Sequence, residues 1–379
     1  MKNNNKIFWL ILVVVTFTLV SVYFAANKTT KTAKVGVIMP LTGPSASLGE
    51  WMKKGVMAAQ SEINASGGIN GVTLELVIED DKCDGKFGVG AYRKLHDVEK
   101  VNYFAGPLCA ASRLPVLKTA ENDNSVLITT GLAVTYNQNT TAKTFNVLPS
   151  VSLVTNNVID YAFGHLGTKK VSLLKVVDEL GNETEAAFKA NMMDRGINNP
   201  HVESFTKGTS DMRSEITKIM SDDSDTVFLS GFSTDYVVFM KQVKELGLEK
   251  TIISLPSIQT PDIAKANVGT GLVVYYSNPS ATDSTSSQAF LKMYQTKDPT
   301  ASIMSPVYLG SGYDAVKILA SGMRKCGDDV QCSQNYISQL DKYPGANGNI
   351  TFGAKGNINS AGSMEIRVLR DGAFSKSSK

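Results

Sequence analysis

Short apolar runs alternate with amphipathic segments along this chain from Val35 onward. The short runs are mostly β-branched and lack polar alternation, which is typical of parallel strands buried on both faces. Between them, segments such as Gly49–Asn64 and Thr234–Leu246 place their apolar residues on one helical face. The expected strands are Val35–Met39, Thr73–Glu79, Tyr103–Gly106, Val126–Thr129, Val171–Val176, Val202–Phe205, Thr226–Ser230, Thr251–Ser254 and Leu272–Tyr276. This repeated alternation predicts an α/β fold with doubly wound parallel sheets.

The alternation is interrupted at three places, Val147–Ser152, Asn278–Ser287 and Pro344–Asn349. One large sheet containing every strand is possible. Two smaller sheets suit 379 residues better, since domains usually have ~100–200 residues. Three breaks in a two-lobed protein indicate that the chain crosses between the lobes more than once, which makes a hinge.

The first 26 residues form a separate segment with the layout of an export signal. Met1–Lys6 is polar and basic, and Ile7–Ala26 then runs without a charge. The apolar part is also long enough to span a bilayer as a helix. A cleaved signal peptide and an uncleaved membrane anchor therefore both stay open for residues 1–26, with Asn27–Lys34 as the tether. In either case we expect the body of the protein outside the cytoplasm, in a periplasm or at the cell surface.

Composition and charge narrow the possible partners. Hydrophobic residues make up 42% of the chain and charged residues 19%, which suits a packed globular core. The net charge is +3, and Lys2 and Lys6 contribute two of these charges. Because the sequence has no basic stripe with interleaved aromatic residues, nucleic acid is not an expected partner.

The four cysteines fall into two local pairs, Cys83 with Cys109 and Cys326 with Cys332. An even count behind an export signal favours two disulfides. Four free buried thiols are the alternative. A zinc site is disfavoured because the pairs lie far apart and no histidine cluster accompanies them. We expect no metal.

The sequence contains no recognisable catalytic constellation. His96, His165 and His201 are scattered, and none takes part in a Ser–His–Asp order or an HExxH spacing. We therefore expect a binding protein without a cofactor rather than an enzyme.

Several motifs together resemble one known family. They are LTGPSASLG at 41–49, EINASGGINGVTLEL at 62–76, DDKCD at 80–84, GPLCAAS at 106–112 and GYDAVKILA at 312–320. They are similar to the branched-chain amino-acid-binding (Leu/Ile/Val-binding protein-like) family of ABC-transporter substrate-binding proteins, which have the type I periplasmic-binding-protein fold. The resemblance covers residues 34–372 and places Cys109 to pair with Cys83.

The resemblance implies two doubly wound lobes joined by a three-segment hinge, with residues 35–149 and 279–349 in lobe 1 and 150–278 and 350–379 in lobe 2. It also implies a monomeric body that closes by hinge motion around a small solute and then docks on an ABC permease. A ligand-sensing receptor on the same fold, working with a separate signalling partner, is the alternative.

Carried over position by position, the resemblance implies a cleft lined by Leu48, Leu108, Ala110, Ala111, Gly131, Ala133, Leu180, Phe232 and Ser257. Trp51, on the helix after the first loop, is a further candidate. Ala110 stands where the family has a serine, Ala133 where it has a threonine, and Ser257 where amino-acid binders have the glutamate that pairs with the ligand ammonium. A zwitterion needs charge-complementary partners when it leaves water. We therefore expect an amino-acid-related or less polar acid or amide as the solute, rather than an ordinary α-amino acid.

Overall fold

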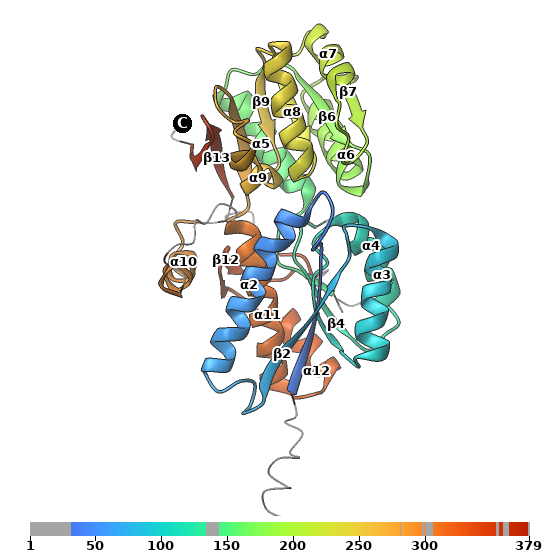
Figure 1. Ribbon diagram of the computed structural model, residues 1–379, viewed down its shortest axis with the longest axis vertical. Helices are drawn as coiled ribbons and strands as arrows, with labels where there is room; N and C mark the ends of the chain where they lie inside the picture. Colours follow the sequence, from blue (N-terminus) through green and yellow to red (C-terminus); the bar gives the residue numbers. More distant parts are fainter. Residues whose placement is uncertain are drawn as a thin grey trace, which may run out of the picture.

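The computed structural model describes residues 32–133, 144–280, 282–297, 299, 306–353, 356–358 and 364–377. These residues form two lobes, each built around its own β-sheet (Figure 1). Within these ranges no helix is both long and apolar enough to cross a bilayer. The predicted N-terminal apolar helix, residues 7–26, lies outside the described residues.

Lobe 1 contains a parallel five-stranded sheet in the order β2-β1-β3-β4-β5. Its strands are β1 (Thr32–Met39), β2 (Thr73–Asp80), β3 (Tyr103–Ala105), β4 (Val126–Thr129) and β5 (Thr144–Asn146). Its helices are α2 (Ala46–Ala65), α3 (Gly85–Arg93), α4 (Ala110–Ala120), α11 (Pro306–Cys326) and α12 (Val330–Ser338). Helices α2 and α11 pack together on one face of the sheet, and α3 and α4 cover the other (Figure 1).

Lobe 2 contains a seven-stranded sheet in the order β14-β13-β10-β9-β8-β6-β7. Strands β6 to β10 are parallel, whereas β13 and β14 add to the edge in antiparallel fashion. The strands are β6 (Val171–Val176), β7 (Val202–Phe205), β8 (Thr226–Ser230), β9 (Thr251–Ser254), β10 (Val273–Asn278), β13 (Glu365–Arg370) and β14 (Ala373–Lys376). The helices are α5 (Val151–His165), α6 (Glu179–Asp194), α7 (Arg213–Ser221), α8 (Ser233–Leu246) and α9 (Pro261–Ala266).

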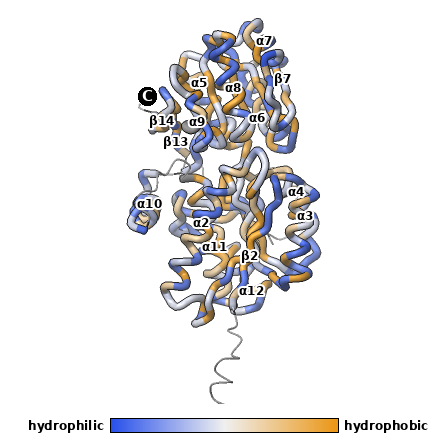
Figure 2. Tube along the Cα trace, viewed as in Figure 1, coloured by the Kyte–Doolittle hydropathy of each residue, from blue (hydrophilic) through white to orange (hydrophobic). Residues whose placement is uncertain are grey.

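Local sequence signals set where several helices begin and end. The side chains of Asp84, Ser150 and Asp178 each accept a hydrogen bond from a backbone N–H in the first turn of α3, α5 and α6. Helix α8 ends at Gly247, whose φ of 72° favours glycine. Hydrophobic residues run through the interior of both lobes, and hydrophilic residues lie along the outer helices (Figure 2). The amphipathic pattern of the sequence is thus satisfied by burial on the sheets.

The fold class predicted from the sequence is confirmed, including the three-segment hinge. The chain leaves lobe 1 between β5 and α5, returns between β10 and α10 (Thr285–Lys297), and leaves again between β12 (Gly348–Ile350) and β13. The exact lobe boundaries proposed above stay predictions.

Three local expectations need correction. Strand β1 begins at Thr32, inside the predicted tether, because Thr32 pairs with Thr73 of β2. Pro344–Asn349 is not a break: it forms most of a hairpin between β11 (Tyr343–Gly345) and β12. Strands β5 and β11 to β14 were not predicted, and all of them except β13 are only three or four residues long.

Both predicted disulfides are present, and the alternatives of free thiols and a zinc site are wrong. Cys83 is bonded to Cys109, with their Cα atoms 5.3 Å apart, and Cys326 to Cys332, at 5.7 Å. Within the described ranges, no cluster of His, Cys, Asp or Glu could hold a metal ion.

A buried carboxylate holds the hairpin turn in place. Asp314 of α11 accepts hydrogen bonds from the backbone N–H of Ala346 at 2.7 Å and from that of Asn347. Burial raises the pKa of Asp314 to about 7, although these two donors favour the ionised form.

The raised pKa predicts how this group contributes to stability. Because the folded state binds the Asp314 proton more tightly than the unfolded chain, stability falls as pH rises from about 4 to about 7. Asp314→Asn should remove about 1–3 kcal/mol of that fall, measured by urea unfolding at pH 4.5 and pH 8. Asp194→Asn, at an exposed position at the end of α6, is the matched control. An unchanged pH slope in D314N would contradict the assignment.

Candidate ligand-binding site

The carboxyl ends of the parallel strands of both lobes face one another. In open parallel sheets, the loops that follow these ends form the usual ligand-binding crevice. The loops after β1, β3 and β4 come from lobe 1, and those after β6, β8 and β9 come from lobe 2. The two sets of loops therefore share one cleft.

These loops line one narrow cavity, which is open to solvent at its mouth. The described residues that line it are Leu48, Leu108, Cys109, Ala110, Arg113, Gly131, Leu132, Leu180, Phe232, Leu255, Ser257 and Tyr308. Both lobes contribute, and most of the lining side chains are apolar. This lining is suited to the apolar body of a small solute.

The structure brings most of the predicted site residues together. Leu48, Leu108, Ala110, Gly131, Leu180, Phe232 and Ser257 all line this cavity. That each of them touches a ligand stays a prediction.

The other three predicted residues make the contacts described next, and that they touch a ligand also stays a prediction. Trp51 is buried in α2, with the Lys54 ammonium 4.4 Å from its ring centre. The backbone of Ala111 faces α3, close to Gly85. Ala133 exchanges backbone hydrogen bonds with the hinge segment at Pro149 and Val151. None of the three is among the residues that line the cavity.

Sequence reasoning missed Arg113, Leu132, Leu255 and Tyr308, and it counted Cys109 only as a disulfide partner. Arg113 follows Ala110 by three positions in α4, so the helical period places the two on the same face. That spacing could have identified Arg113. Tyr308 lies at the start of α11, far along the chain, and no local signal marks it.

Arg113 is the notable side chain of this cavity. Its side chain is 2% exposed, and its Nη2 donates to the carbonyl oxygen of Leu132. Its Nη1 has no hydrogen-bond partner among the described residues. Burial lowers the pKa of Arg113 to about 10, while Glu183 and Tyr308 act in the opposite direction. The guanidinium is therefore still a cation at neutral pH.

Ser257 stabilises the loops around the cavity. Its hydroxyl donates to the carbonyl oxygen of Gly231 at 2.9 Å and lies 2.9 Å from the Tyr236 hydroxyl. Burial raises the pKa of Tyr236 to about 12, so this phenol is neutral. The position expected to hold a ligand ammonium thus carries a neutral hydroxyl that is already bonded.

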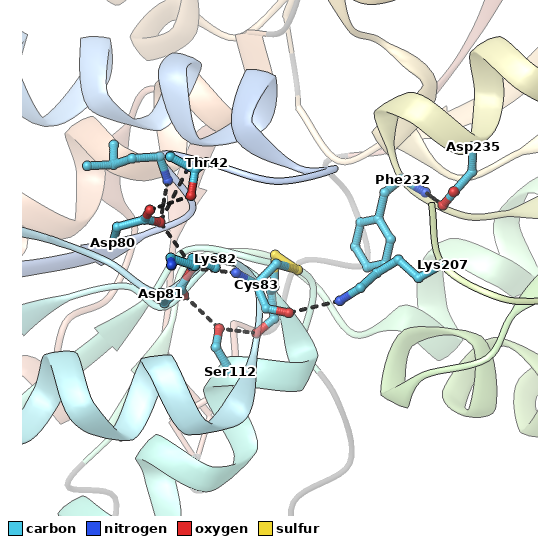
Figure 3. The surroundings of a disulfide bond; sticks show 11 residues. Thr42, Asp80, Asp81, Lys82, Cys83, Ser112, Lys207, Phe232 and Asp235 are labelled. Carbon is cyan, nitrogen blue, oxygen red and sulfur yellow. Dashed lines mark hydrogen bonds between the residues drawn. A yellow bond between two sulfur atoms is a disulfide. The ribbon is translucent and has the colours of Figure 1, made fainter. Parts of the chain in front are cut away.

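Direct contacts hold the two lobes together at the cleft. Lys207, in the loop after β7, donates to the carbonyl oxygen of Cys83 at 2.9 Å (Figure 3). Its ammonium also lies 5.6 Å from the ring centre of Phe232, which lines the cavity. On the other side, Ser47 of α2 donates to Asp262 of α9 at 2.6 Å. We call the contacts of Lys207 and Ser47 the latch. They join the lobes in a closed arrangement.

The Cys83–Cys109 disulfide connects the latch to the cavity wall. Cys83 supplies the carbonyl that Lys207 binds, and Cys109 lines the cavity immediately before α4. Below them, Asp81 accepts hydrogen bonds from the Cys83 N–H at 2.9 Å and from the Ser112 hydroxyl at 2.7 Å (Figure 3). These bonds fix the loop after β2 against the start of α4.

Comparisons with known proteins agree with this geometry. The family model described as periplasmic binding protein matches residues 32–372. A Leu/Ile/Val-binding protein of Rhizobium johnstonii is 26% identical over 332 residues, covering 86% of this chain and 89% of its own length. A leucine-binding protein of Thermotoga maritima superimposes with a TM-score of 0.81 at 20% identity, over 92% of this chain and 98% of its own. An ABC-transporter solute-binding protein of R. palustris, in complex with benzoate, superimposes with a TM-score of 0.78 at 19% identity. The match covers 91% of this chain and 95% of that protein.

The close packing at Gly131 predicts a sensitive position. A Cβ on Gly131 would lie 1.8 Å from the Leu108 carbonyl oxygen and 3.0 Å from Arg113 Nη1. Gly131→Ala should therefore push the loops after β3 and β4 apart and cost about 2 kcal/mol or more in unfolding free energy. Gly164→Ala is the control, since a Cβ there meets nothing within 4 Å. Equal stability of G131A and G164A in urea unfolding would refute the packing assigned to this site.

Proposed function

Since the chain belongs to the periplasmic binding protein family, we propose that it captures a small organic solute between its lobes and delivers it to an ABC permease. The observation that carries the proposal is the cavity lined by both lobes and closed by the latch. A site divided between two bodies binds its ligand fully only when they close. The closed form is then a distinct surface that a permease recognises.

The cavity supports an amino-acid-related or less polar acid or amide as the solute. The relative from Rhizobium johnstonii is named for leucine, isoleucine and valine, whereas the R. palustris neighbour is in complex with benzoate. Leu180 and Phe232 offer apolar surface, and Ser257 offers no charge to an ammonium. These features favour a less polar solute over an ordinary α-amino acid.

The hinge and the predicted export signal complete the proposal. Closure takes place by bending at the three crossing segments, and the body works as a monomer outside the cytoplasm. A binding role, rather than catalysis, agrees with the solute-binding relatives. A cleaved signal peptide and an anchor through residues 7–26 both suit this location.

The direct test is to identify what the protein carries. The chain is purified without denaturation, its bound small molecules are released by acid, and they are identified by mass spectrometry. Adding back the released compound should raise the thermal midpoint and reduce the radius of gyration measured by X-ray scattering. A protein that carries nothing, and that no small molecule from a cell extract stabilises or closes, would refute a solute-binding role.

The latch predicts an effect on affinity. Lys207→Met removes the hydrogen bond to the Cys83 carbonyl and the contact of the ammonium with Phe232. Because these contacts form only on closure, the affinity for the released compound should fall about 3- to 15-fold, through faster dissociation. Lys169→Met, at an exposed position just before β6, is the matched control. If both variants bind like the unmodified protein in calorimetry, Lys207 does not hold the lobes closed.

A further inference from the structure

Arg113 is a buried cation with an unused hydrogen-bond donor. Its Nη2 is bonded to Leu132, and its Nη1 has no partner among the described residues. A buried hydrogen-bond donor of a charged group that is left unpaired is unfavourable. A ligand that accepts a hydrogen bond from Nη1 on closure would therefore gain a charge-assisted hydrogen bond. It would also remove the free-energy penalty of the unpaired donor.

The free nitrogen lies beside a residue of the cavity wall. Nη1 lies beside Gly131, where an added Cβ would be 3.0 Å away, and both Arg113 and Gly131 line the cavity. Helix α4 begins at Ala110, which also lines it. The first N–H groups of a helix have no intrahelical partner, and the helix dipole favours an anion there. Nη1 and the start of α4 therefore offer donors to the same anion.

The rest of the lining excludes a second charge on the solute. Arg113 is the one charged side chain among the described residues that line the cavity. The Ser257 hydroxyl already donates to Gly231. Glu183 of α6 interacts electrostatically with Arg113 but is not part of the lining. A ligand ammonium would thus be buried without a charge partner, which is unfavourable.

We propose that Arg113 is the anion anchor of the cleft and that the solute is a small monocarboxylate with an apolar body and no ammonium group. The carboxylate accepts from Arg113 Nη1 and from the backbone at the start of α4. The apolar body lies among Leu48, Leu180 and Phe232. The inference rests on the proposed function and narrows its solute from an acid or amide to an acid. A primary amide has no negative charge and would give Nη1 only a weaker, neutral hydrogen bond.

The test is a competition between matched compounds. The full chain is incubated with linear, branched and aromatic monocarboxylates of four to eight carbons, with their primary amides, and with L-leucine and L-valine. Native mass spectrometry then reads which compounds are retained, and calorimetry measures their dissociation constants. We expect monocarboxylates to be retained and their amides to bind at least 10-fold more weakly.

Variants of Arg113 assign the effect to this side chain. Arg113→Gln should weaken carboxylate binding about 10- to 100-fold and abolish the preference for acid over amide. Arg113→Lys keeps the charge without the planar guanidinium. Its carboxylate affinity should lie between those of the unmodified protein and R113Q. Arg195→Gln, at the end of α6 where the guanidinium pairs with Asp160, should bind like the unmodified protein. Thermal midpoints without ligand show whether each variant is folded.

The outcomes separate the two proposals. The role of Arg113 is wrong if the protein retains an amide or leucine in preference to the acids. It is also wrong if folded R113Q binds carboxylates as tightly as the unmodified protein. Both results leave solute binding intact. If the protein retains none of these compounds but binds a neutral or zwitterionic solute from a cell extract, the carboxylate proposal also fails alone. If it binds neither, both proposals fail.

Discussion

The parallel direction of the strands is the constraint on which the rest of this structure depends. Because β1, β3 and β4 of lobe 1 all point the same way, the loops that follow them gather at one edge. The corresponding edge of lobe 2 lies opposite. The cavity, the latch and the Cys83–Cys109 disulfide are all built from residues in or beside these loops. The sheets therefore act as supports, and the cleft is lined by the loops and helix starts that follow their strands.

Charge placement connects the proposed solute with closure of the cleft. Arg113 is buried and its Nη1 has no partner among the described residues, so in the proposal an anionic solute offsets part of its desolvation. The latch of Lys207 and Ser47 adds contacts that form on closure whatever the solute. In the proposed function, the latch and the anion on Arg113 act together to favour the closed state with solute bound.

The sequence predicted the fold well because the core strands and helices carry strong local patterns. It missed β5, β11, β12 and β14, which are too short for periodicity to reveal, and it took Pro344–Asn349 for a break because proline and glycine also form hairpins. Seven predicted site residues line the cavity, since they follow strand ends. Arg113 was missed although its helical spacing from Ala110 marks it. Tyr308 was missed because its place in the cavity depends on long-range packing, since α11 returns from the far end of the chain.

The central claim is that the closed cleft holds an anionic solute on Arg113. A crystal structure of the protein with a retained monocarboxylate tests it most directly. The account predicts the carboxylate between the two lobes, about 2.7–2.9 Å from Arg113 Nη1, with the Lys207–Cys83 contact formed. A solute outside this cavity, or one that lies in it with an uncharged end toward Arg113, would contradict the account.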